Sequence, residues 1–183
     1  MSFRKSLGGR HNPYFQAIQE RQLLGMPERA DEGPKIRIIA DDFKEKQLIK
    51  LVLLKMPVEA SYSILKVLRE IEVRGCLEEG IWKVDFSHEN DTDLRFKLIF
   101  SHKRLAQLSN ASIEGIVALA LAQVYLLFQK GRDSSMELEE NASEEKRTQL
   151  DEKDVQEAEL QAVNWGFKRE IKAAIDEIAK LSI

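Results

Sequence analysis

The amino-acid sequence predicts an α+β fold, in which a short strand and a β-hairpin form a small, mostly antiparallel sheet covered by helices. Two patterns predict this class. Residues 81–100 alternate between apolar and polar side chains in two runs, which is typical of half-buried strands. Residues 113–128 are almost continuously apolar, which is typical of a buried helix that covers such a sheet. An additional long amphipathic helix is expected at the C-terminus.

Composition divides the 183 residues into four regions. Glycines and prolines interrupt every candidate element of residues 1–34, so this region is expected to be a mobile tail. Residues 35–131 carry the regular patterns and form the predicted globular core, whose length suits a single domain. An acidic linker, 132–147, and the amphipathic helix, 148–183, are expected to follow.

The first half of the core is expected to contain one strand and two helices. Residues 35–40 form a short β-branched run and are predicted to be a strand. Asp42 and Glu45 have the spacing of a capping box, and the helix that starts there is expected to end at Pro57. A second helix should continue to Gly75, because glycine favours a helix C-terminus. The apolar positions of this second helix are Ile64, Leu65, Leu68 and Ile71.

The second half of the core is expected to contain the hairpin and the buried helix. The polar loop 87–93 separates the two alternating runs, so they should pair with one apolar face and one charged face. The apolar face must be covered. The helix 113–128, with candidate N-caps at Ser109, Asn110 and Ser112, is expected to lie on it. The apolar positions of the hairpin are Trp82, Val84, Phe86, Leu94, Phe96, Leu98 and Phe100.

The C-terminal helix carries a single apolar stripe with spacings of three and four residues. At 1.5 Å per residue its roughly 30 residues would measure about 45 Å, whereas a core of this size is roughly 26 Å across. The helix should therefore extend beyond the core, and Gly166 is a candidate position for a bend. The predicted partner-binding residues are Leu160, Val163, Trp165, Phe167, Ile171, Ile175, Ile178 and Leu181.

These features favour a non-enzymatic interaction or scaffold protein that forms homo-oligomers or docks a protein partner through its C-terminal helix. No Gly-rich phosphate loop, Cys-x-x-Cys pair or His-x-x-x-His pair occurs in the sequence. The carboxylates and His102 are expected on solvent-exposed faces, so no catalytic residue, cofactor, metal or small-molecule substrate is predicted. The single cysteine, Cys76, favours a reducing compartment, which is the cytoplasm, with the nucleus also compatible.

An alternative function is binding to nucleic-acid phosphates or to an anionic membrane, as in a viral matrix-like or nucleoprotein-associated structural protein. The net charge of −3 argues against a strongly basic surface but permits a local basic patch. The competing interpretation is a solvated face that Asp85 or the acidic linker neutralises. The residues predicted to bind anions are Arg4, Lys5, Arg10, Arg95, Lys97, Lys103 and Arg104.

Overall fold

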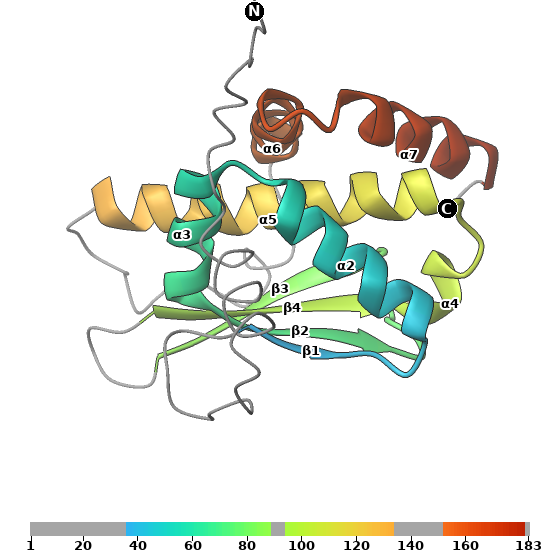
Figure 1. The fold of residues 1–183 in the computed structure, drawn as a ribbon, viewed down its shortest axis with the longest axis horizontal. Coiled ribbons are helices and arrows are strands. Elements are labelled where there is room, and N and C mark those ends of the chain that lie inside the picture. The colour runs from blue at the N-terminus through green and yellow to red at the C-terminus, as the bar shows by residue number, and fades with distance from the viewer. Residues whose placement is uncertain (1–35, 89–93, 134–151, 182–183) are drawn as a thin grey trace, which may run out of the picture.

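The fold is known from a computed structural model, which describes residues 36–88, 94–133 and 152–181. Within these residues a four-stranded sheet is covered by helices on one face, and the predicted α+β class is confirmed (Figure 1). The other face of the sheet carries no helix of the described part of the chain. The predicted mobile tail lies outside the described residues. The predicted acidic linker does too, apart from residues 132–133, which end a helix.

The sheet is mixed, with strand order β1-β2-β4-β3. Its strands are β1 (Arg37–Ile39), β2 (Leu68–Arg74), β3 (Trp82–His88) and β4 (Leu94–Ser101). The hairpin pair β3 and β4 is antiparallel, as predicted. However, β2 lies parallel to both of its neighbours, β1 and β4, so the expectation of a mostly antiparallel sheet was wrong.

The strand β2 replaces the second half of a predicted helix. Helix α3 (Val58–Val67) ends where β2 begins, and the expected continuation to Gly75 was wrong. From Glu70 onward acidic and apolar residues alternate as in a strand, but a register shift between Leu68 and Glu70 interrupts that period. The resulting spacing from Leu68 to Ile71 also fits a helix, and the neighbouring strands decide between the two structures.

The hairpin has the predicted apolar face, and its register is set by the pairing of β3 with β4. Val84 lies opposite Leu98, and Trp82 lies opposite Phe100 at the end of the pair. Leu98 and Phe100 are fully buried beneath the helical layer. The alternation in sequence was therefore sufficient to place both strands and to choose the face that packs on the helices.

Helix α2 (Phe43–Lys55) begins and ends close to the predicted positions. The Oδ1 atom of Asp42 accepts a hydrogen bond from the backbone N–H of Lys44 at 2.7 Å, which confirms Asp42 as the N-cap. Glu45, the other residue of the expected capping box, has a different contact. Glu45 is buried and its carboxylate contacts His102, which follows β4.

Helix α5 (Asn110–Asp133) is the central helix, and it lies between the sheet and the C-terminal helices (Figure 1). It is longer at both ends than the predicted helix 113–128 and runs past residue 131, where the core was expected to end. Its N-terminus is capped as predicted, since Ser109 Oγ accepts from the backbone N–H of Ser112 at 3.3 Å. On the sheet side, Trp82 Nε1 donates to Gln123 Oε1 at 3.0 Å, which satisfies the most polar side chain in the middle of the helix.

The segment Asn110–Lys130 of α5 is long and apolar enough to cross a membrane by length and composition. The core helix of a soluble protein meets the same criterion, and more than half of this segment is buried inside the fold. In this structure the apolar surface of α5 packs against the sheet, α2 and α3 on one side and against two C-terminal helices on the other.

The C-terminal amphipathic segment is helical, but Gly166 divides it into α6 (Glu152–Asn164) and α7 (Lys168–Leu181). Gly166 has a φ of 99°, a left-handed conformation that a continuous α-helix cannot contain. Both helices fold back onto α5, so the single helix of about 45 Å that would extend beyond the core does not form. Residues of α6 and α7 belong to the same hydrophobic core as the sheet.

Candidate functional site

The stripe predicted to bind a partner is divided between the core and the surface. Phe167 is only 2% exposed, whereas Leu160 is 63% exposed. A buried residue cannot line a docking surface while the fold is intact, so the stripe is not one continuous surface. Trp165, Phe167 and Ile171 are buried, Val163 and Ile178 are half-buried against the core, and Leu160, Ile175 and Leu181 are exposed.

Small residues explain why the buried face of α6 and α7 differs from the predicted stripe. The predicted stripe contained only large apolar residues and therefore omitted three small residues that are buried: Ala158, Ala162 and Ala174. In α5, a Cβ atom on Gly115 would lie 2.3 Å from the carbonyl oxygen of Glu170 in α7. At Gly115 the backbones of α5 and α7 therefore approach so closely that only glycine fits there.

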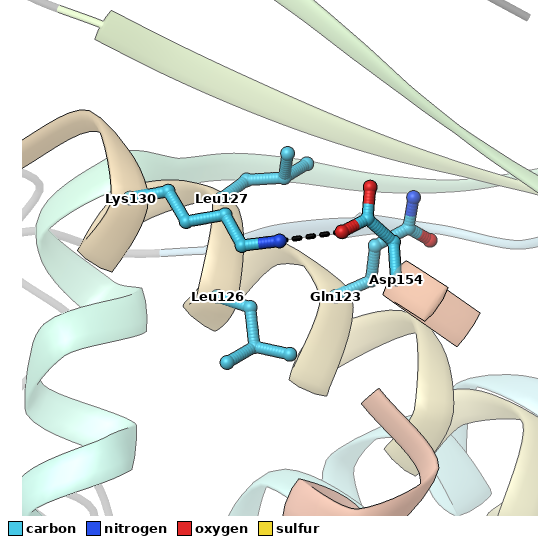
Figure 2. Close-up of a pocket in the computed structure, with 5 residues that line it drawn as sticks. All are labelled: Gln123, Leu126, Leu127, Lys130 and Asp154. Atoms are coloured by element: carbon cyan, nitrogen blue, oxygen red, sulfur yellow. Dashed lines mark hydrogen bonds and ion pairs between the residues drawn. The ribbon is translucent and has the colours of Figure 1, made fainter. Parts of the chain in front are cut away.

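A polar junction fixes α6 against the end of α5 (Figure 2). The ammonium group of Lys130 in α5 pairs with Asp154 and, at 3.1 Å, with Glu157, and these two carboxylates raise the pKa of Lys130. The cavity beside this junction has a volume of only about 10 Å³, which is at the lower limit for one water molecule. The junction therefore holds two helices together and has no room for a ligand.

Among the described residues that were predicted to bind anions, Lys97 is paired with acids. Lys97 on β4 pairs with Glu70 and, at 2.6 Å, with Glu72, and both acids come from the unexpected strand β2. Arg74 donates to Glu72 at 2.9 Å. Hydrogen bonds from Arg74 and then from Lys97 lower the pKa of Glu72 to about 2.

The charges on this outer face alternate across all four strands. Arg37, Glu70, Lys97 and Asp85 lie next to one another in the register from β1 to β3. Asp85 contacts Lys83 at 3.2 Å on its own strand. Cross-strand pairs of opposite charge stabilise a sheet and leave little net charge for a polyanion.

The other predicted basic residues are dispersed. Arg95 is half-buried on β4, and it has interactions within the fold. The short helix α4 (His102–Leu105) carries Lys103, which is exposed, and Arg104, which is half-buried. Arg4, Lys5 and Arg10 lie outside the described residues.

The Glu72 carboxylate leads to a prediction for acid stability. Its lowered pKa contributes stability that is present above pH 4.5 and is lost as the pH falls towards 2. Because solvent reaches this pair, we expect Glu72→Gln to lower the free energy of unfolding by about 1 kcal/mol at neutral pH. The difference between the two proteins should disappear between pH 4.5 and pH 2. Urea denaturation at several pH values measures it.

The control for this prediction is Glu78→Gln, which removes an exposed carboxylate. Its difference from the unmodified protein should stay close to zero throughout the same pH range. A Glu72→Gln difference that is independent of pH would show that the ion pairs on the outer face do not stabilise the fold.

Sequence patterns did not predict the contact between Glu45 and His102. The distance between Glu45 Oε1 and His102 Nδ1 is 2.9 Å, and these residues lie beside a cavity at the edge of the sheet. The signal in the sequence was the position of Asp41, Asp42 and His102 directly after strands. The positions of these residues indicate a contact only when β2 is known, because β2 is parallel to both β1 and β4 and so brings the ends of these two strands to the same edge of the sheet.

Comparisons with known protein families, with curated proteins and with solved structures find no match to this chain.

Proposed function

We propose that this chain is a non-enzymatic interaction protein that self-associates or docks a protein partner on the outer surface of α6 and α7. The observation that carries the proposal is the exposure of large apolar side chains on these two helices. Leu160 is 63% exposed and Ile175 is 47% exposed. Val155 and Leu181 are exposed on the same pair of helices.

Single exposed apolar residues are common on protein surfaces and need no explanation. Here they are concentrated on a short helical pair, and the apolar residues of that pair also include a buried set that packs on α5. The pair therefore has one face for the core and further apolar positions outside it. The expected helix that projects from the core is absent, because α6 and α7 pack on α5. The proposal therefore rests on the exposed apolar residues of α6 and α7.

Removal of residues 146–183 is not a suitable test of this proposal. Phe167 and Ile171 belong to the core, so the truncated protein would expose the apolar surface of α5 and could lose its fold. Substitutions of exposed residues are a cleaner test, because surface substitutions usually change the free energy of unfolding by less than about 0.5 kcal/mol.

The test compares two double variants by size-exclusion chromatography with light scattering over a range of protein concentrations. We expect the full chain to form a dimer or a larger assembly. Leu160→Ser with Ile175→Ser should weaken it by at least about tenfold, because each buried aliphatic side chain contributes roughly 1.5–3 kcal/mol. The control is Phe43→Ser with Tyr62→Ser, which removes exposed apolar residues from α2 and α3 and should leave the assembly unchanged.

Equal masses for the two double variants and the unmodified assembly would contradict a role for α6 and α7. A monomer at every concentration would overturn self-association. The proposal would then require docking of a different protein to the same surface.

A further inference from the structure

Helix α2 carries apolar side chains on both of its faces. Its buried face includes Leu48 and Val52, and the helix packs against α5 at the surface of the helical layer (Figure 1). On the outward face Phe43 is 73% exposed, which is the largest exposure of any large apolar side chain in the described part of the chain. An ordinary surface helix has polar residues on this side. The outward positions, at spacings of three and four, are Phe43, Gln47, Lys50, Leu51 and Leu54.

Lysines accompany the apolar residues of this outward face. Lys50 lies on the face itself, and Lys44 and Lys46 flank it near the start of the helix. Within the described residues none of these three ammonium groups forms an ion pair. Lys55, at the other end of the helix, differs from them because it pairs with Glu114 of α5 at 2.5 Å. The outward face therefore offers three cations to an anionic partner.

The acids of this region do not lie on the outward face. The only acid within α2 is Glu45, which is buried on the opposite side and contacts His102. The nearest exposed acids are beyond the two ends of the helix, where Asp41 precedes it and Glu59 belongs to α3. Along its length the solvent side of α2 therefore combines positive charge with exposed phenylalanine and leucine.

We propose that the outward face of α2 binds the surface of an anionic lipid bilayer. Phe43 and Leu51, both exposed, would enter the boundary between headgroups and acyl chains, and the lysines would lie next to the lipid phosphates. Lysine suits this position because its long apolar stem can lie along the bilayer while the ammonium group stays in water. A nucleic acid would use the lysines and would stack on an aromatic ring, but it offers no apolar layer to the aliphatic Leu51.

The experiment is co-sedimentation of the full chain with phosphatidylcholine vesicles that contain phosphatidylserine. Vesicles of phosphatidylcholine alone test the need for negative charge, and polyuridylic acid tests whether any polyanion suffices. We expect binding to the phosphatidylserine vesicles only, and we expect it to weaken as salt is added, because salt screens the attraction between lysines and lipid phosphates.

Two pairs of variants separate charge from insertion. Lys46→Gln with Lys50→Gln should weaken vesicle binding by at least about tenfold, since each lysine near an anionic surface contributes about fivefold. Lys46→Arg with Lys50→Arg should retain binding because it retains the charge. Phe43→Ser should weaken binding by about tenfold, whereas Phe43→Leu, which keeps an apolar side chain, should retain most of it.

A control for net charge is Lys168→Gln with Lys172→Gln, which removes two exposed cations from α7. This variant should bind vesicles as the unmodified protein does. An equal loss in this control and in Lys46→Gln with Lys50→Gln would overturn the proposal, because net charge rather than α2 would then determine binding.

Three further results would overturn the proposal. The first is the absence of binding to phosphatidylserine vesicles at low salt. The second is equal binding to vesicles of phosphatidylcholine alone. The third is unchanged vesicle binding in Phe43→Ser together with binding to polyuridylic acid, which would make the surface a general polyanion site. The α2 variants leave Leu160 and Ile175 unchanged, so vesicle binding is tested separately from the proposed docking function.

Discussion

Replacement of Gly115 by alanine is expected to destabilise the fold by about 2 kcal/mol, although alanine is the better helix former. The new Cβ atom would lie 2.3 Å from Glu170 O and 2.9 Å from Ile171 N. Both are backbone atoms of α7, so no side-chain rotation can relieve the contact, and α7 must move away from α5. The movement would also loosen the packing of Ile171, which is buried at this contact.

Urea denaturation of Gly115→Ala and Gly75→Ala measures this effect. Gly75 is the matched control, because a Cβ atom there would meet no other atom within 4 Å. Its substitution should change the free energy of unfolding by less than about 0.5 kcal/mol. If Gly115→Ala were as stable as the unmodified protein, the close crossing of α5 and α7 would be contradicted. A second-site change in α7 that restores stability would support it.

Local patterns predicted those elements whose periodicity is regular. The alternation from Trp82 to Phe86 placed the hairpin strand β3, and the capping residue Asp42 placed the start of α2. The strand β2 could not be predicted in the same way. Its period is interrupted at Leu68 and Glu70, and its parallel pairing with two distant strands is not encoded in its own residues.

The contact surface of the C-terminal helices was missed for a related reason. A search for large apolar residues finds Leu160 and Ile175, whereas the close approach of α5 and α7 is at Gly115, and the small residue Ala174 is buried. Small residues contribute little to an apolar pattern but allow a close backbone approach. Gly166 was recognisable as a candidate bend, yet only the structure shows that it ends one helix and starts another.

The cavity beside Glu45 depends on three segments that are distant in sequence. Asp42 and Glu45 have the spacing of a capping box, and that local interpretation explained both residues without reference to His102. The pairing of Glu45 with His102 requires β2 to lie between β1 and β4. The same missing strand explains why Lys97 was expected to be free, since Glu70 and Glu72 come from β2.

Replacement of Phe167 by alanine is expected to lower the free energy of unfolding by about 3–5 kcal/mol, which is the usual cost of removing a buried phenylalanine side chain. Phe167 is 2% exposed, and it lies in the turn between α6 and α7 within the common core. The substitution leaves a cavity where the C-terminal helices meet the rest of the core. Because the free energy of unfolding of native domains is only about 5–15 kcal/mol, this single substitution should remove a large part of the stability of the protein.

Leu160→Ala is the matched control, because it also removes a large apolar side chain from the predicted stripe. Leu160 is 63% exposed, so its substitution should change the free energy of unfolding of the monomer by less than about 0.5 kcal/mol. Urea denaturation at low protein concentration measures both variants. Similar losses of stability would contradict the division of the stripe into core and surface. A large loss for Phe167→Ala alone would show that the part of the stripe that completes the core is distinct from the part that is exposed.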